Sequence, residues 1–369
     1  MPGMKLSRPI FGLNGELLLR AGAVLTARNI MSLRRNGVLA VEINGPISFE
    51  GDRDVITDEV RRNMMGVVRE WTFKRCDEVA VKTGKTELVE ITKSVEVIVE
   101  EILSGKEVAG SLAEICSCDI YTYAHSVDVC ILSLMVGVKL GYPKPKLLRL
   151  GVGSLLHDIG KVKVPAEILN KPGELTPNEF AEIKKHPEYG RQMFVNIRNA
   201  SSQSAAIILN HHERYDGSGY PRSLKGDKID EMSAICGVAD VYNAITTDRV
   251  YRKALPPHEA YEMIMASGGF MFNFKVVNAF LECVTPYPVG SMVRLSNGLA
   301  GVVCKLNVAP FRPVVKTVEG EEIDLLDRAN ISVVIADVMH PEELRNLASK
   351  ETDTINAAAH GKKTVQARG

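Results

Sequence analysis

The stretch LLHDIGKVKV, residues 155–164, sets the organisation of the whole chain. His157 and Asp158 stand side by side in it, at the end of an apolar run that predicts a helix. A carboxylate beside an apolar core is unfavourable unless a partner compensates its charge, and a metal ion is the strongest partner available. One His-Asp pair also occurs on ordinary surfaces, so the prediction depends on what the rest of the chain supplies.

The composition is that of a folded protein of two or three domains. Of the 369 residues, 45% are hydrophobic and 24% are charged, which is enough for a sizeable core. Lys+Arg and Asp+Glu both number 45, so the formal net charge is zero. This balance argues against a nucleic-acid polymer as partner. A small phosphorylated ligand needs only a local basic cluster and is not excluded.

The seven cysteines include no CxxC pair and are odd in number, which is typical of reduced thiols in a cytoplasm. The chain has no signal-like apolar segment at its start, and no run reaches the roughly 18–20 apolar residues of a membrane span. We therefore expect a soluble, cytoplasmic protein.

The pattern of the chain predicts a multi-domain, mainly α protein with a helical core between two small modules. Residues 1–48 predict a small α+β regulatory module, in which Asn14-Gly15 marks a hairpin, Thr26 caps a short helix and residues 38–43 form a returning strand. Residues 52–115 predict a helical connector of two amphipathic helices. We expect these helices to pack on the core, with support of a homodimer as the alternative.

The chemical part of the chain, residues 116–284, is helical by pattern. Thr176, Pro177 and Glu179 supply an N-cap, a first-turn proline and a capping-box acid in order. Pro187 should then kink or restart that helix.

In residues 286–340 the sequence pattern changes to short runs typical of β-strands, with Asn297-Gly298 and Glu319-Gly320 as turn signals. This predicts a small β module at the C-terminal side of the core. Residues 349–369 are polar and predict a flexible tail.

Histidines and aspartates gather at the ends or in the middle of the apolar helices of the core. The set is His125, His157, Asp158, His186, His211, His212 and Asp240. A single core histidine is usually a satisfied packing residue. Seven such groups on five helices are much harder to explain that way, because together they could not satisfy one another without a metal.

Imidazole and carboxylate ligands without thiolate suit Fe, Mn, Zn or Ni rather than a structural zinc site. Seven donors exceed what one ion takes, so two ions bridged by one carboxylate fit better. In such sites a bridging water becomes a hydroxide near neutral pH, and the metals hold the oxygens of a phosphodiester. Lys161, one helical turn past His157, is placed to stabilise phosphoryl charge.

Four segments resemble the HD-GYP subset of the HD-domain phosphohydrolases. They are HDIGK (157–161), His186, HHERYDGSGYP (211–221) and ADVYNAITTDR (239–249). The resemblance covers roughly residues 100–284 and implies a helical HD-type catalytic core. The first 45 residues also look like the small domain that often precedes HD-GYP domains in bacterial proteins.

The resemblance implies a cyclic di-GMP phosphodiesterase that opens the ring to linear pGpG and often continues to GMP, with diguanylate cyclases of the GGDEF type as protein partners. It assigns His125, His157, Asp158 and Asp240 to one metal, and the bridging Asp158 with His186, His211 and His212 to the second. Fe or Mn is expected first, with Ni or Zn as alternatives. Lys161, Arg249 and Arg252 match positions that contact phosphate, and Tyr220 matches a position that lines the guanine-nucleotide pocket.

Two positions depart from the family pattern. Tyr121 stands where some members hold a third metal with a glutamate, so we expect two metals. Asn273 replaces an expected aspartate at a helix start, where asparagine still caps.

Two alternatives remain at this point. The same site could act on another cyclic dinucleotide, or the protein could be a signalling adaptor that binds cyclic di-GMP or a diguanylate cyclase with little turnover. The complete set of metal-ligand types, with Asp158 and Lys161 as the catalytic pair, favours catalysis.

Overall fold

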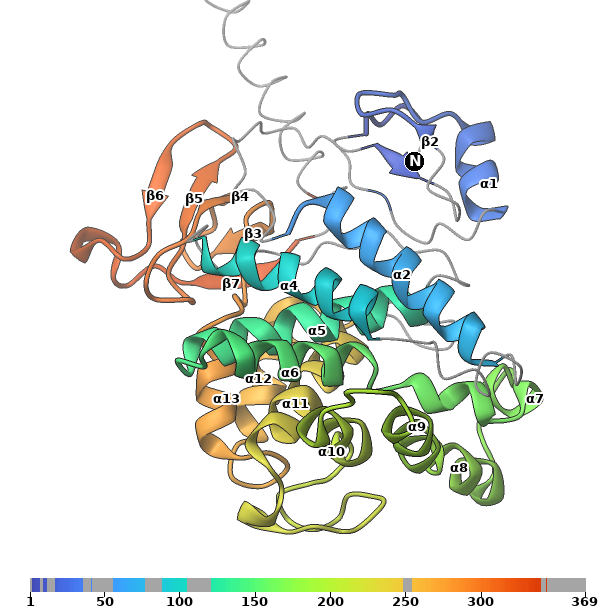
Figure 1. The fold of residues 1–369 in the computed structure, drawn as a ribbon. Helices are drawn as coiled ribbons and strands as arrows, with labels where there is room; N and C mark the ends of the chain where they lie inside the picture. The colour runs from blue at the N-terminus through green and yellow to red at the C-terminus, as the bar shows by residue number, and fades with distance from the viewer. Residues whose placement is uncertain are drawn as a thin grey trace, which may run out of the picture.

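The structure is a computed structural model that describes residues 2–6, 9–11, 17–35, 41, 56–76, 88–104, 121–247, 254–339 and 343. A helical core and a small antiparallel sheet make up most of this part of the chain (Figure 1). This agrees with the expected HD-type helical core and C-terminal β module. The domain limits drawn from the sequence remain predictions.

Helix α5 (Tyr121–Lys139) is the central element of the core. It packs against α6 (Lys144–Leu155) and α11 (Glu231–Thr246). Its residues 124–137 are all buried, as expected for a helix that is apolar on every side. Side chains that α5 and α11 carry toward their shared contact are therefore shielded from water.

After α6 the chain continues directly into a short 3₁₀ helix, η1 (Ile159–Lys163), so that His157 and Asp158 lie at the junction. The next helices are α7 (Ala166–Leu169), α8 (Pro177–Ile183), α9 (His186–Val195) and α10 (Ser202–Asn210). Thr176 and Glu179 form the expected capping box at α8, and the chain restarts as α9 beside Pro187. Helix α9 packs on η1, and α10 packs on both α9 and α6.

The short 3₁₀ helix η2 (Gly226–Lys228) precedes α11, and two further helices close the core. They are α12 (Pro257–Ala266) and α13 (Phe274–Leu281), which pack on α11. Asn273 caps α13 by accepting hydrogen bonds from the backbone N–H groups of Lys275 and Val276, as predicted.

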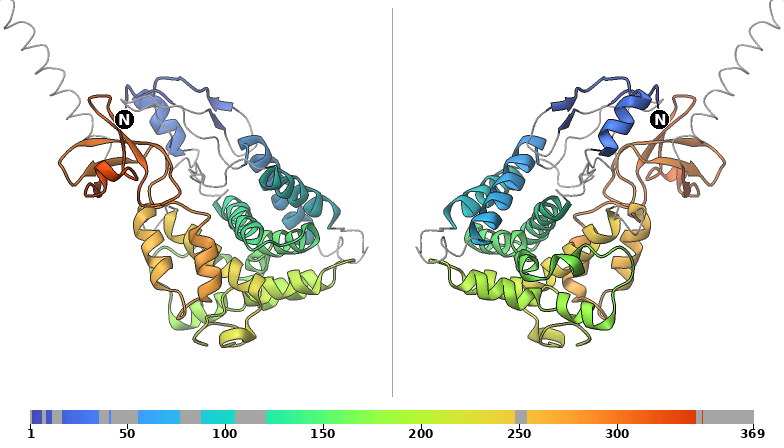
Figure 2. Two further views of the ribbon diagram at one scale, coloured as in Figure 1. Left: turned by 90° about the vertical axis from the view of Figure 1, so that its left-hand side faces the viewer. Right: turned by 90° about the vertical axis from the view of Figure 1, so that its right-hand side faces the viewer.

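Two connector helices, α2 (Asp58–Cys76) and α4 (Val89–Leu103), pack on each other and on the outside of α5, and α4 also packs on α6 (Figure 2). Helix α4 buries one apolar face, with Ile91, Val95, Ile98, Val99 and Ile102. Arg61 of α2 pairs with Asp128 of α5, whose side chain is fully buried. The predicted packing of the connector on the core is thus present.

The C-terminal sheet has the strand order β6-β5-β4-β3-β7 and is antiparallel throughout. Its strands are β3 (Met292–Leu295), β4 (Ala300–Lys305), β5 (Val314–Thr317), β6 (Glu322–Asp324) and β7 (Ile335–Val338), with the 3₁₀ helix η3 (Arg328–Asn330) before β7. Phe311 of this module packs edge-on against Tyr261 of α12, which joins the sheet to the helical core.

At the N-terminus, β1 (Ile10–Phe11) pairs with β2 (Leu17–Leu19), and α1 (Ala27–Arg35) follows. Thr26 accepts a hydrogen bond from the N–H of Asn29, as a helix cap does. The returning strand expected at 38–43 and the tail at 349–369 lie outside the described residues, Val41 excepted. Among the described helices, none has both the length and the apolar character needed to cross a bilayer.

Candidate metal centre

The seven histidines and aspartates singled out in the sequence converge on one place in the core. They come from α5 (His125), the α6–η1 junction (His157, Asp158), α9 (His186), the end of α10 (His211, His212) and α11 (Asp240). All are buried except His212, which is half-buried. Five separate segments therefore deliver polar groups to one shielded volume.

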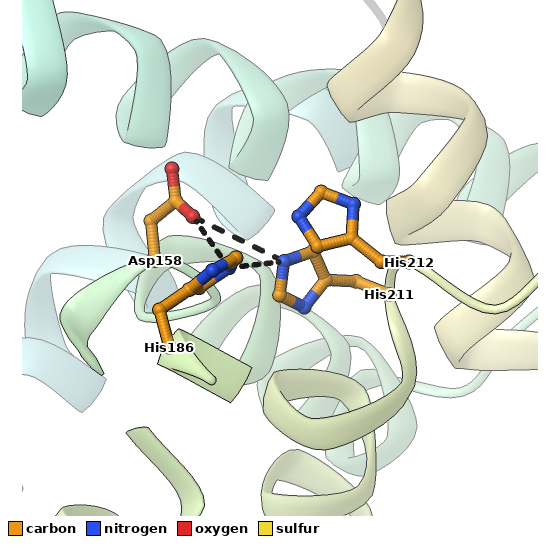
Figure 3. Close-up of side chains that lie close together, drawn as sticks. All are labelled: Asp158, His186, His211 and His212. Atoms are coloured by element: carbon orange, nitrogen blue, oxygen red, sulfur yellow. Dashed lines mark hydrogen bonds and ion pairs between the residues drawn. The ribbon is translucent and has the colours of Figure 1, made fainter. Parts of the chain in front are cut away.

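Asp158 lies in the middle of this group, and its two oxygens face different imidazoles. Oδ1 is 3.2 Å from Nε2 of His186 and 4.0 Å from Nε2 of His211 (Figure 3). Oδ2 is 3.3 Å from Nε2 of His157 and 3.9 Å from Nε2 of His125. A carboxylate that bridges two ions must likewise present one oxygen to each ion and its histidine ligands.

Asp240 of helix α11 contacts two of the imidazoles. Its Oδ1 is 3.1 Å from Nε2 of His125, and its Oδ2 is 3.8 Å from Nδ1 of His212. The potential ligand atoms form three overlapping clusters, each within 4.8 Å: Asp158, His186, His211 and His212; His125, His157 and Asp158; His157, His211 and Asp240. The first two clusters share Asp158 and together contain six of the seven residues.

Three of the imidazoles share one orientation, in which Nδ1 lies against the carbonyl oxygen three residues earlier. The pairs are His157 with Ser154 at 2.7 Å, His186 with Ile183 at 2.8 Å, and His211 with Ile208 at 3.0 Å. A carbonyl can only accept, so Nδ1 carries the proton and donates. Nε2 then presents its lone pair to the centre, which is the arrangement found in metal-binding histidines.

His125 reaches the same orientation through a side chain. Its Nδ1 lies 2.6 Å from Oδ1 of Asn243, one helical turn after Asp240 on α11. Sequence reasoning missed Asn243, although its spacing of three from Asp240 places both on one face of the helix and could have indicated it.

Two buried polar atoms at the centre make no hydrogen bond within the described part of the chain, and two buried nitrogen atoms face each other. Nε2 of His186 and Nε2 of His211 face each other at 3.3 Å. Buried Nε2 of His157 and Oδ1 of Asp158 make no hydrogen bond. Buried donors and acceptors are nearly always satisfied, and divalent metal ions would satisfy these nitrogen and oxygen atoms. The residues present therefore fit a metal centre.

The electrostatics of the aspartates keep them anionic. Burial works against the charged form of Asp158, yet the charges of Lys161 and His157 hold its pKa well below the usual value. For Asp240, burial is likewise outweighed by the hydrogen bond and charge of His125, and its pKa is also well below normal.

The tandem histidines are held neutral. Burial, followed by the charge of His212, lowers the pKa of His211 well below normal. Burial lowers the pKa of His212 to about 3. His157 differs: burial lowers its pKa, but the charge and hydrogen bond of Asp158 and the charge of Asp240 together outweigh burial and raise it. Two of the three imidazoles are thus in the deprotonated form that binds metal.

Lys161 lies at the edge of the centre. Its Nζ is 2.5 Å from Oδ2 of Asp158, and its side chain is 31% exposed. The ammonium group therefore stands between the buried carboxylate and solvent, where an incoming anion would meet it.

The HHERYDGSGYP segment folds as a loop against the centre. Buried Glu213 accepts hydrogen bonds from the backbone N–H groups of Arg222 at 2.7 Å and Leu224 at 2.8 Å. A Cβ at Gly219 would lie 2.3 Å from the backbone nitrogen of Arg214, so only glycine fits there. The loop thereby presents Tyr220, whose ring stacks on His212 with centroids 4.6 Å apart.

Glycines allow the backbones of neighbouring elements to approach closely beside the centre, so that the histidines and aspartates can reach one another. A Cβ at Gly160 would lie 1.9 Å from the carbonyl oxygen of His186, and one at Gly237 would lie 2.6 Å from that of His211. These glycines let η1 meet α9 and let α11 meet the end of α10.

Two phosphate-contacting residues expected from the resemblance, Arg249 and Arg252, lie outside the described residues. The side chain of Tyr121 is also outside them. The sequence did not predict that Glu213 anchors the loop. This role depends on backbone N–H groups nine and eleven residues later in the chain, which only the folded loop brings close.

Comparison with known proteins gives concordant results. The HD domain family matches residues 101–272. The cyclic di-GMP phosphodiesterase PA4108 of Pseudomonas aeruginosa is 44% identical over 193 residues, 52% of this chain and 46% of that protein. A cyclic di-GMP phosphodiesterase of Thermotoga maritima is 33% identical over 241 residues, 65% of this chain and 64% of that protein.

A 3'3'-cGAMP-specific phosphodiesterase 2 of Vibrio cholerae is 41% identical over 130 residues, 35% of this chain and 25% of that protein. The chain thus spans less than two thirds of the length of each of these relatives. The matched segment contains the converging histidines and aspartates and the GYP loop. Residues 101–272 of this chain thus match the HD domain family, and the motif strings that resemble the HD-GYP subset lie inside that match.

Proposed function

We propose that the protein is a metal-dependent phosphodiesterase that hydrolyses cyclic di-GMP to pGpG, with further hydrolysis to GMP as a second step. The observation that carries the proposal is the placement of Asp158 between two groups of imidazoles, each facing a different carboxylate oxygen. The names of the relatives supply the substrate class.

Two divalent ions, Fe or Mn before Ni or Zn, are the proposed cofactors. His125, His157, Asp158 and Asp240 would hold one ion, and Asp158, His186, His211 and His212 the other. When bound, such ions supply Lewis acidity toward phosphoryl oxygens and lower the pKa of water.

The chain's own residues have separate tasks in this proposal. Asp158 and Asp240 provide charge that stays negative at neutral pH because their pKa values are lowered. The carbonyl partners of His157, His186 and His211 orient the rings. Lys161 would stabilise negative charge on the phosphoryl group being cleaved.

Binding of the rest of the substrate is proposed for the remaining expected residues. Arg249 and Arg252 would pair with phosphate oxygens through their planar forks. Tyr220 would line the nucleotide pocket, held in place by its stacking on His212. Residues 1–48 would regulate the site through the connector helices.

The test is turnover by protein purified without oxygen and supplied with Mn²⁺ or Fe²⁺ and cyclic di-GMP, with the products separated by chromatography. We expect pGpG to appear, and Asp158→Ala to abolish it. Tight binding of cyclic di-GMP without turnover would support the adaptor instead. Because one relative is named for 3'3'-cGAMP, that dinucleotide is the competing substrate, and a higher kcat/KM for it would reassign the substrate.

A further inference from the structure

Lys184 lies beside the metal centre without taking part in it. This half-buried lysine follows the last residue of α8, two positions before His186. Its Nζ is 4.7 Å from the ring centroid of Phe180 and 5.3 Å from that of Tyr220. Since Tyr220 stacks on His212, a single aromatic ring links the ammonium group of Lys184 to a member of the centre.

Lys184 also differs from its neighbours in its partners. Lys161 pairs with Asp158, Lys171 with Glu179, and Lys185 with Glu182. Within the described part of the chain, no carboxylate lies within ion-pair distance of Lys184, and its contacts are with aromatic rings. Such contacts hold the ammonium group in place but leave its charge uncompensated. A fixed, uncompensated cation at the rim of a site is suited to an anion.

A cyclic dinucleotide carries two phosphodiesters on opposite sides of one ring, and the centre can cleave only one at a time. Lys161 stands at Oδ2 of Asp158, on the side of His157. Lys184 stands beyond Tyr220, on the side of His212. The two ammonium groups therefore lie next to different members of the centre: Lys161 next to Asp158, and Lys184 next to His212 with the ring of Tyr220 between them.

We propose that Lys184 binds the phosphodiester of the cyclic dinucleotide that is not being cleaved. This role rests on the proposed function, because it takes its substrate class from there. It makes Lys184 a specificity residue, which favours substrates with a second phosphate over simple diesters.

The experiment compares kcat/KM for cyclic di-GMP with kcat/KM for bis(p-nitrophenyl) phosphate, a diester without a second phosphate. Lys184→Met keeps the length of the side chain and removes the charge. A charge-assisted hydrogen bond that is lost should lower the ratio of the two values about tenfold, mainly through KM for cyclic di-GMP. Lys184→Arg should restore most of it, because the charge returns.

The matched control is Lys185→Met, which removes the adjacent lysine, whose partner is Glu182. A surface ion pair of this kind contributes little, so the ratio should stay within about twofold of the wild type. Equal loss with both substrates in Lys184→Met would show a structural role and overturn the proposal. An unchanged ratio would overturn it as well.

Failure of the proposed function looks different, because the wild type would then not hydrolyse cyclic di-GMP. In that case equilibrium binding of cyclic di-GMP decides the role of Lys184. We expect Lys184→Met to raise the Kd about tenfold and Lys185→Met to leave it unchanged. The same Kd in both variants and the wild type would overturn the role.

Discussion

The Nε2 atoms of His186 and His211 lie 3.3 Å apart, and the Nδ1–H group of each ring donates a hydrogen bond to a backbone carbonyl. Two lone pairs at this distance repel unless a cation or a proton lies between them. Asp158 Oδ1 completes this corner of the centre at 3.2 Å from His186. The local backbone thus orients these rings for metal binding before any ligand arrives.

Asn243 should control metal affinity without controlling the fold. Asn243→Ala removes the oxygen that holds Nδ1 of His125. Loss of such an outer partner typically weakens metal binding about 10–100-fold. Calorimetric titration with Mn²⁺ measures the effect. The control is Asn196→Ala, at the exposed end of α9, which should keep the wild-type affinity. Equal affinity in Asn243→Ala and the control would contradict this role.

Gly160 should be intolerant of even one added carbon. In Gly160→Ala the new Cβ would lie 1.9 Å from the carbonyl oxygen of His186, so η1 and α9 must separate. Such overpacking lowers the free energy of unfolding by about 1–3 kcal/mol and should move His186 away from Asp158. Denaturant unfolding measures the loss.

Gly66 on α2 is the matched control for Gly160. A Cβ there meets nothing within 4 Å. Gly66→Ala should therefore raise the free energy of unfolding, by about 0.5–1 kcal/mol, because alanine is the better helix former. A Gly160→Ala protein as stable as the wild type would show that the contact between η1 and α9 is looser than described.

Glu213 should keep the GYP loop closed. Its two oxygens accept from Arg222 and Leu224, and the amide of Glu213→Gln can replace only one acceptor. The partly buried N–H that loses its acceptor should lower stability by about 1–3 kcal/mol. Hydrogen exchange of residues 213–224 should then quicken, while Glu188→Gln, on an exposed position, leaves it unchanged. Unaltered exchange in Glu213→Gln would argue that the loop has another anchor.

Arg61 and Asp128 should couple the connector to the core. Removing Arg61 alone, as in Arg61→Met, leaves the fully buried Asp128 without its ion-pair partner. Breaking one side of a buried pair lowers stability by about 3–5 kcal/mol, whereas replacing both partners by apolar residues is often neutral. A double-mutant cycle with Asp128→Leu measures the coupling. Strictly additive losses would show that the two residues do not interact.

The features that the sequence predicted correctly are local or carried by a long motif. The Thr176–Glu179 capping box and the Asn273 cap depend on residues within one turn. The apolar run of α5 predicted a buried helix because its pattern admits no exposed face. Six of the seven histidines and aspartates that the structure brings together lie in the motif strings, and His125 lies in the apolar run of α5.

The features that escaped prediction depend on contacts across the chain. Strand β6 has three residues and no alternation to reveal it; its pairing with β5 decides its conformation. The contact between Lys184 and Tyr220 joins residues 36 positions apart, and its geometry requires the folded loop. The close approach at Gly160 likewise exists only once α9 has packed on η1.

The number of metal ions per chain tests the central claim most directly. Protein purified without oxygen should contain two transition-metal ions per chain by elemental analysis, and Asp158→Ala should lose both, because its carboxylate faces both groups of imidazoles. Asn196→Ala should retain two. One ion or none in the wild type, or two ions in a folded Asp158→Ala protein, would contradict a centre bridged by Asp158.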